Sequence, residues 1–263
     1  MGLMKNIADL PRALPRTDGK KLLRVTGLPA VAALFATAPR RVEKLFFDQR
    51  AKSRVGAFCA ILARARKPYR LVGSEELARV AGTILHGGVV AMAQPRPITR
   101  FDPDEATAWA GDGRLLLLLD GVGNPHNLGA IARTAAFFGL PRIVLSDHPA
   151  QALPSDASYR VAEGGLEYVE VYRGTPFVSA LEKLRRSHLV VGAAAEGGRP
   201  IAMLRRSERS FALVLGNEEA GLRPATIKVC DEIVTIPGSR SLQSLNVAAS
   251  AAILIFAMAA KLD

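Results

Sequence analysis

The sequence predicts an α/β protein whose larger part is a parallel sheet covered by helices on both faces, preceded by a smaller α/β unit. The first observation behind this prediction is that short runs of consecutive apolar residues alternate with helical patterns through the second half of the 263-residue chain. Parallel strands that are buried on both faces have this composition, and they need crossover helices between them. The predicted strands are 115–119, 142–145, 168–171, 189–193, 211–215 and 233–236.

The second observation is a shorter alternation of helices and strands before residue 95. Apolar residues at three- and four-residue spacing indicate helices, and Ser74 is suited to cap one whose first turn holds Glu75 and Glu76. The predicted elements are helix 30–38, strand 42–47, helix 53–66, strand 71–72, the helix that follows Ser74, and strand 88–93.

These patterns divide the chain into four segments. Residues 1–20 are polar, contain proline and glycine, and are expected to form a flexible tail. Residues 21–95 form the predicted small domain. Residues 96–112 are rich in proline and glycine and read as a linker, and residues 113–263 form the predicted larger domain.

Charge is distributed unevenly between the two parts. Residues 1–100 hold 19 Lys and Arg against 6 Asp and Glu, whereas residues 101–263 hold 16 against 18. A basic module joined to a near-neutral one is typical of a protein that binds a polyanion through one domain. The alternative is that the surplus arginine reflects biased composition and solubility.

Composition indicates a globular protein in a reducing, cytoplasmic setting. The two cysteines, Cys59 and Cys230, predict no disulfide framework. No signal-peptide pattern is present, and the longest apolar stretch, 247–260, is shorter than the ~20 residues that cross a bilayer. We therefore expect neither export nor a membrane partner.

Three polar turns are the candidates for chemistry. The first, 120–127, follows a strand but lacks the third glycine of a dinucleotide-binding loop, which disfavours a nucleotide-dependent oxidoreductase. Asn127 could simply cap the next helix, and Arg133 within that helix is either functional or part of a structural salt bridge. The four histidines are scattered, so no metal site is expected.

The second and third turns add further polar residues. Glu218 lies between two glycines, where an exposed acidic loop is the alternative explanation. Ser244 and Asn246 precede an apolar helix, and helix capping alone could explain them. Because ligands of open α/β sheets bind beyond the carboxyl ends of the strands, we expect the three turns to meet at one pocket.

The order of these segments resembles a known family. N-L-G-A-I-A-R-T-A-A-F-F-G (127–139), L-G-N-E-E-A-G-L (215–222) and I-P-…-S-L-N-V (236–247) are similar to the three motifs of the SpoU, or TrmH-type, RNA ribose 2′-O-methyltransferases of the SPOUT superfamily. Residues 22–93, with R-V-T-G-L-P-A-V and H-G-G-V-V-A, resemble the ribosomal-protein-L30e-like substrate-binding domain that often precedes them.

This resemblance implies a trefoil knot formed by the C-terminal segment, a bent S-adenosyl-L-methionine held largely by backbone groups, and a homodimer. The implied substrate is a ribose 2′-hydroxyl in transfer or ribosomal RNA. Carried over by position, the implied cofactor-binding residues are Leu215, Gly216, Ile236, Leu245, Ala193 and Ala194, and the implied catalytic residues are Asn127, Arg133, Glu218, Ser244 and Asn246.

A sulfonium-activated methyl group needs no metal, so the protein has to align the reactants and manage the hydroxyl proton. Family mechanisms make Arg133 the residue that activates the hydroxyl, either as a base or by binding the adjacent phosphate and polarising the hydroxyl. Gly238 and Arg240 depart from the family's third motif, and Glu163 stands where relatives often have serine. The alternative to an active enzyme is a non-catalytic RNA-binding or ribosome-assembly factor that retains the fold.

Overall fold

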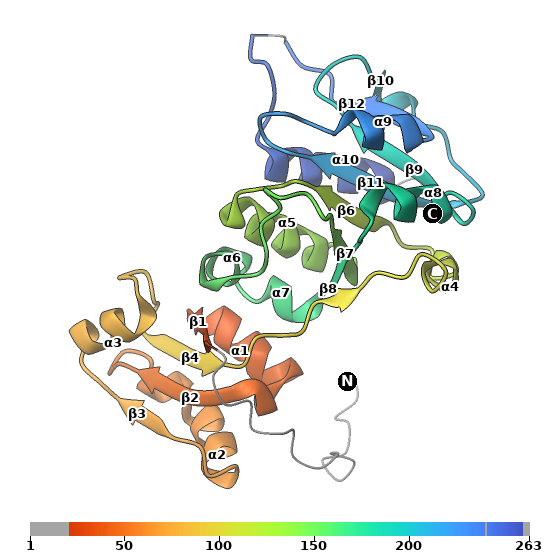
Figure 1. Cartoon of the computed structure of the whole chain (residues 1–263). Helices are drawn as coiled ribbons and strands as arrows, with labels where there is room; N and C mark the ends of the chain where they lie inside the picture. The colour runs from red at the N-terminus through yellow and green to blue at the C-terminus, as the bar shows by residue number, and fades with distance from the viewer. Residues whose placement is uncertain (1–20, 240, 260–263) are drawn as a thin grey trace.

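The computed structural model describes residues 21–239 and 241–259. The predicted tail, 1–20, and the departure at Arg240 lie outside the described residues. Two sheets organise the rest, one of four strands and one of eight, with helices packed around each (Figure 1). The predicted α/β class is confirmed.

The smaller sheet has the strand order β1-β4-β2-β3, in which β4 is antiparallel to β1 and β2, while β2 and β3 are parallel. One face packs against α1 through Val25, Leu45 and Ala91, and the other is partly covered by α3 through Leu77 and Val90. The elements are β1 Leu23–Thr26, α1 Leu28–Thr37, η2 Pro39–Arg41, β2 Val42–Phe47, η3 Lys52–Arg54, α2 Gly56–Arg64, β3 Tyr69–Leu71, α3 Ser74–Ala81 and β4 Val89–Ala93.

The larger sheet has the order β10-β12-β9-β11-β6-β7-β8-β5, and every neighbouring pair is parallel. Its strands are β5 Thr99–Arg100, β6 Leu116–Asp120, β7 Arg142–Leu145, β8 Glu170–Arg173, β9 His188–Ala193, β10 Arg199–Pro200, β11 Ser210–Gly216 and β12 Glu232–Thr235. Its helices are α4 Ala106–Ala110, α5 Pro125–Phe137, α6 Asp156–Ala162, α7 Gly165–Tyr168, α8 Phe177–Leu184, η4 Ile201–Met203, α9 Pro224–Val229 and α10 Val247–Ala259.

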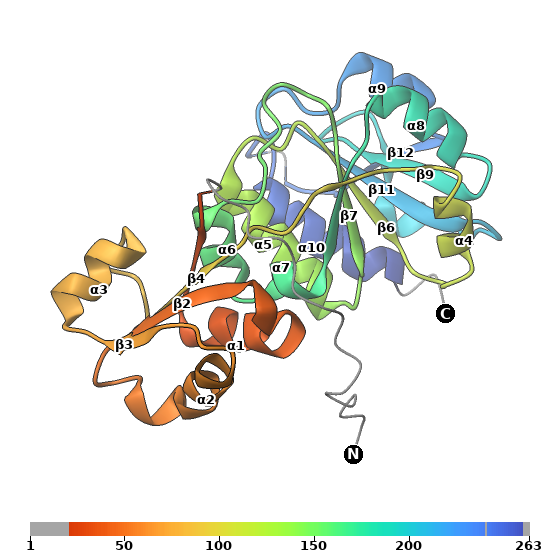
Figure 2. The same cartoon turned by 60° about the horizontal axis from the view of Figure 1, so that its bottom comes forward.

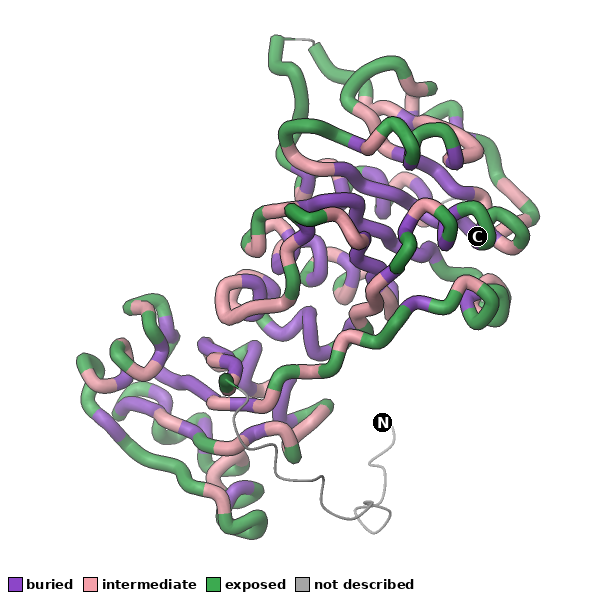
Figure 3. Tube along the Cα trace, in the orientation of Figure 1, coloured by how far each residue is buried: buried purple, intermediate pink, exposed green. Residues whose placement is uncertain are grey.

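Both faces of the larger sheet are buried, as the apolar runs predict. Successive side chains of a strand point to opposite faces, so Leu117 and Leu119 of β6 pack with α5 and α10, whereas Leu116 and Leu118 pack with α8. Figure 3 shows this burial continuing along the central strands. The trefoil knot concerns how the chain threads through itself, and it stays a prediction.

Several details differ from the sequence-based expectations. The strand expected at 71–72 is β3 at Tyr69–Leu71, and the helix expected at 53–66 is divided into η3 and α2. Ser74 is the first residue of α3 rather than its cap, because Gly73 occupies the cap position without a side-chain hydrogen bond. Asn127 lies within α5 and does not cap it, because the helix begins at Pro125 and its cap is Asn124. The strand expected at 168–171 is β8, two residues later, because α7 runs through Tyr168. The segment expected to be a linker contains β5 and α4.

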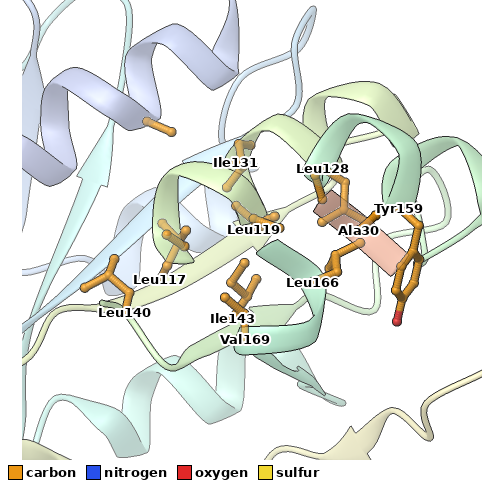
Figure 4. Close-up of a cluster of buried hydrophobic side chains, with 14 of the residues drawn as sticks. Ala30, Leu117, Leu119, Leu128, Ile131, Leu140, Ile143, Tyr159, Leu166 and Val169 are labelled. Atoms are coloured by element: carbon orange, nitrogen blue, oxygen red, sulfur yellow. The ribbon is translucent and has the colours of Figure 1, made fainter. Parts of the chain in front are cut away.

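The two sheets are joined by a packed contact in which α1 lies against α6 and α7 (Figure 2). Ala30 of α1 belongs to the same apolar cluster as Tyr159 and Leu166 (Figure 4). Beside it, Nη1 of Arg41 lies 2.6 Å from Oε2 of Glu167, whose side chain is fully buried. The contact therefore combines apolar packing with a desolvated ion pair.

Helix α10 corresponds to the long apolar stretch of the sequence and has 13 residues. Along residues 21–239 and 241–259, none of the helices has the length and apolar character needed to cross a membrane.

Candidate active site

The carboxyl ends of the central strands bring the three polar turns to one edge of the larger sheet. In the parallel pairing, Gly216 at the end of β11 lies opposite Asp120 at the end of β6, and Ala193 at the end of β9 lies opposite Val234 of β12. The turn after β6 and the turn after β11 therefore begin side by side. Figure 1 shows the loop before α10 descending onto the same edge.

Glu218 joins the second turn to the first. Its Oε1 accepts a hydrogen bond from Nδ2 of Asn127 at 2.8 Å and from the backbone N–H of Asn124 at 3.2 Å. Its Oε2 accepts from the N–H of Gly123 at 3.0 Å. Glu218 is thus an anchor between two turns and not a free acidic side chain.

These hydrogen bonds also determine the charge of Glu218. Partial burial by itself raises the pKa of a carboxyl group, because it disfavours the ionised form. Here the hydrogen bonds from Asn127, Gly123 and Asn124 outweigh that desolvation and hold the pKa of Glu218 below its ordinary value. Glu218 is consequently a carboxylate at neutral pH, with its oxygens already occupied by donors.

Asn127 extends the connection to the third turn. Its Oδ1 accepts a hydrogen bond from Nδ2 of Asn246 at 3.1 Å. Asn246 in turn caps α10, since its Oδ1 accepts from the N–H of Ala248 at 2.8 Å. The cap of α5 is Asn124, whose Oδ1 accepts from the N–H of His126, so capping does not explain Asn127. The three turns meet through Glu218, Asn127 and Asn246.

Arg133 and Ser244 make no described hydrogen bond with Glu218, Asn127 or Asn246. Nη2 of Arg133 lies 3.1 Å from Oε2 of Glu163, and both side chains are more than half exposed. The structural salt bridge considered for Arg133 is therefore present. Ser244 is exposed, and among the described residues its hydroxyl has no hydrogen-bond partner.

The residues expected to bind the cofactor lie at this same edge. Leu215 is buried, Ala193, Ala194 and Ile236 are half-buried, and Leu245 is 48% exposed. A Cβ at Gly216 would overlap the backbone of Gly221 and Leu222, so the 217–221 turn folds back onto the strand only because residue 216 is glycine. Partly exposed apolar side chains beside strand-end backbone suit the apolar parts and hydrogen-bonding groups of an adenosyl ligand.

Further residues that sequence reasoning did not single out hold the turns in place. Nδ2 of Asn217 donates to the carbonyl of Gly121 at 2.8 Å, and Oδ1 of Asn217 accepts from the N–H groups of Glu219 and Ala220. The buried Gln151 accepts from the N–H of Gly121 at 2.9 Å. The position of Asn217 inside the second motif could have identified it from the sequence. No local sequence pattern singles out Gln151.

A buried charged group supports the second turn from below. Asp120 is fully buried at the end of β6, its Oδ2 accepts from Oγ1 of Thr226 at 2.6 Å, and Nη2 of Arg223 lies 2.7 Å from its Oδ1. Arg223 also approaches Asp147 at 3.4 Å. The network ties α9 and the preceding turn to β6. Across 21–239 and 241–259, no group of three or more His, Cys, Asp or Glu could hold a metal ion.

Comparison with known proteins assigns both parts of the chain. Residues 114–256 match the SpoU rRNA Methylase family, and residues 24–99 match the RNA 2′-O ribose methyltransferase substrate binding family. The 23S rRNA (guanosine-2′-O-)-methyltransferase RlmB of Acinetobacter baylyi is 33% identical over 88% of this chain and 94% of its own length.

Two further comparisons agree. A protein of Escherichia coli O157:H7 named as an uncharacterized tRNA/rRNA methyltransferase, YfiF, is 34% identical over 93% of this chain and 70% of its own length. The crystal structure of an AdoMet-bound rRNA methyltransferase from Sinorhizobium meliloti shares the fold, with a TM-score of 0.75, 20% identity, and coverage of 90% of this chain and 87% of that one.

The two family matches and the likeness to RlmB identify a methyltransferase that uses S-adenosylmethionine and acts on the ribose 2′-hydroxyl of RNA. Within that class, the chain belongs to the SpoU rRNA methylase family.

Proposed function

We propose that this protein methylates the ribose 2′-hydroxyl of a guanosine in 23S ribosomal RNA. The observation that carries the proposal is the hydrogen-bonded connection of the three motif turns through Glu218, Asn127 and Asn246. The likeness to RlmB along nearly all of RlmB's length favours ribosomal over transfer RNA. Because its substrate would be ribosomal RNA, we expect the protein to act in the cytoplasm.

We assign the cofactor to the strand-end edge formed by Leu215, Gly216, Ile236 and Leu245, with Ala193 and Ala194 beside it. When bound there, S-adenosylmethionine supplies a methyl group that is already activated. The task left to the protein is to hold the ribose oxygen in line with that group, which requires turns that do not move. The hydrogen bonds of Glu218 and Asn127 provide this rigidity.

Arg133 is assigned to the RNA and not to the cofactor. A guanidinium is not deprotonated in proteins, so Arg133 acts by binding the phosphate next to the target ribose and polarising the hydroxyl. Its exposed ion pair with Glu163 is worth about 0–1 kcal/mol, which a phosphate contact can replace. The hydroxyl of Ser244, which has no hydrogen-bond partner among the described residues, is available to hydrogen-bond the ribose.

The small domain is assigned to RNA binding. Ten of its cations are exposed, and residues 21–95 contain four acids. The exposed cations are Lys21, Arg40, Lys44, Arg50, Lys52, Arg54, Arg64, Arg66, Arg70 and Arg79. Contacts of this kind with phosphates position an RNA without reading its sequence.

We assign the apolar surface of α5 and α10 to the contact with a second copy of the chain. Phe137 is 83% exposed and Phe256 is 66% exposed, and both rings adjoin Phe138, with centroids 5.2 Å and 6.3 Å away. Exposed aromatic clusters of this kind mark interaction surfaces. A homodimer through this surface would cover the rings.

The experiment that tests the function is methyl transfer from a labelled donor to 23S ribosomal RNA and to total transfer RNA, followed by mass mapping of the methylated ribose. We expect label on one guanosine of 23S RNA. Label only on transfer RNA would contradict the assigned substrate. Binding of both cofactor and RNA without any transfer would identify a non-catalytic assembly factor instead.

A further inference from the structure

A short sequence pattern occurs twice in the larger domain. Leu-Arg-Arg-Ser stands at 184–187, directly before β9, and again at 204–207, three residues before β11. Strands β9 and β11 are parallel neighbours, with His188 opposite Ser210. Both patterns therefore lie at the amino edge of the sheet, opposite the edge that carries the motif turns. Leu184 packs into the cluster of α8 on one face, and Leu204 packs into the cluster of α10 on the other.

Direct contacts connect Arg209, two residues after the second pattern, with Arg185 of the first pattern and with Asp231. Nη1 of Arg209 donates to the carbonyl of Arg185 at 2.8 Å. Nε of Arg185 donates to Oδ1 of Asp231 at 2.9 Å, and Arg209 lies 3.7 Å from the other oxygen of Asp231. That oxygen also accepts from the N–H of Val190. The carboxylate of Asp231 is thus already occupied by the two arginines that order the surface.

The remaining arginines are not neutralised. Arg186, Arg205 and Arg206 are exposed, and none has an ion pair or side-chain hydrogen bond among the described residues. Counting 182–188, 204–209 and Asp231, six cations stand against three acids. We name Arg185, Arg186, Arg205, Arg206 and Arg209 the paired-arginine surface. An excess of guanidinium groups without an acidic partner among the described residues, at one edge of the sheet, favours a ligand with several negative charges.

We propose that the paired-arginine surface binds the phosphate backbone of the RNA substrate, at nucleotides away from the methylated one. Guanidinium groups bind phosphate oxygens bidentately, so arginine suits this ligand better than lysine does. The seven residues of β11, at about 3.3 Å each, place this surface about 20 Å from the motif turns. Only an RNA long enough to pass around the sheet reaches both.

This inference rests on the proposed function, because it takes the ligand to be RNA. The test compares the full-length wild type with two triple variants, R186Q/R205Q/R206Q and R186K/R205K/R206K. A mixed-sequence RNA duplex serves as the probe, and its dissociation constant is measured by fluorescence anisotropy over a series of salt concentrations. Thermal unfolding and calorimetry with S-adenosylmethionine check that each variant is folded.

The glutamine variant should bind the duplex at least several-fold more weakly at low salt. The slope of log K against log salt should fall by about 2–3, since each lost phosphate contact removes about 0.9. The lysine variant should keep most of the slope. Unchanged affinity and slope in a glutamine variant that still binds the cofactor would overturn the proposal.

Further outcomes would show that the surface binds another ligand, or that the proposed function itself is wrong. The wild type could bind polyglutamate or phosphatidylglycerol vesicles more tightly than the duplex, and the glutamine variant could lose that binding. This result would overturn RNA as the ligand. Wild-type protein that methylates no RNA would refute the proposed function. Methylation by the wild type together with an unchanged slope in the glutamine variant would refute only the paired-arginine surface.

Discussion

The Nδ2 group of Asn127 lies 2.8 Å from Oε1 of Glu218, a residue 91 positions further along the chain. This hydrogen bond connects the turn after β6 with the turn after β11. Since Asn127 also accepts from Asn246, one amide side chain links all three turns of the candidate site. The consequences of this arrangement can be measured.

Replacing Glu218 by Gln should loosen the site. An amide nitrogen would face one of the N–H donors of Gly123, Asn124 or Asn127, and an unsatisfied polar group costs about 1–3 kcal/mol. We expect a lower free energy of unfolding and a loss of methyl transfer. Glu219→Gln is the matched control, because that side chain is exposed and makes no described contact. Equal behaviour of the two variants would contradict the anchoring role.

Replacing Arg133 by Ala should abolish methyl transfer while changing the affinity for S-adenosylmethionine by no more than several-fold. The guanidinium is assigned to the RNA phosphate, and its described partner is the exposed Glu163. Steady-state methylation and calorimetry measure the two effects. Glu163→Gln is the companion variant, and it should lower KM for RNA by at most about 5-fold, since an exposed ion pair is worth at most about 1 kcal/mol. Full activity of Arg133→Ala would refute the assigned role.

Breaking the buried ion pair between Arg41 and Glu167 should lower the free energy of unfolding more than breaking the exposed pair of Arg24 and Asp156. Glu167→Gln leaves the guanidinium of Arg41 without a charge partner in a largely desolvated position, which costs about 3–5 kcal/mol. Arg24→Gln is the control, since Arg24 and Asp156 are 4.0 Å apart and both more than a third exposed. That change should cost less than about 1 kcal/mol. Chemical denaturation measures both values, and equal losses would contradict the difference in burial.

The aromatic surface of α5 and α10 provides a test of oligomeric state. Phe256→Asp places a charge among Phe137 and Phe138, and we expect it to convert a dimer into a monomer without unfolding the chain. Sedimentation velocity measures the change. Leu242→Asp is a control at a similarly exposed apolar side chain on another segment. A wild-type monomer, or a dimer that survives Phe256→Asp, would exclude this interface.

His188 should make stability depend on pH. Burial lowers the pKa of this side chain from 6.5 to about 4, because the charged form is desolvated. The unfolded chain then binds a proton that the folded chain does not, so stability is full above about pH 6.5 and falls as the pH drops toward 4. The loss at low pH is about 3 kcal/mol at most. His188→Gln should flatten this dependence in thermal unfolding curves, and an unchanged curve would contradict it.

Several parts of the molecule could be predicted because their signals are local. The central strands follow from apolar runs, and β2 and β7 begin and end at the expected residues. Edge strands such as β5 and β10 have only two residues each, which is too short for any pattern. The pairing of Arg133 with Glu163 stayed open because it depends on where α6 ends relative to α5.

The sequence by itself determined the α/β class, the basic character of the small domain and the order of the three motif turns, because each of these is written in neighbouring residues. Only the tertiary structure decided that Glu218, Asn127 and Asn246 meet, that Glu167 is buried against Arg41, and that the two Leu-Arg-Arg-Ser segments come to the same edge of the sheet. The physical reason is that these contacts depend on which strands are neighbours in the sheet. Strand order is set by long-range packing, to which no single stretch of sequence corresponds.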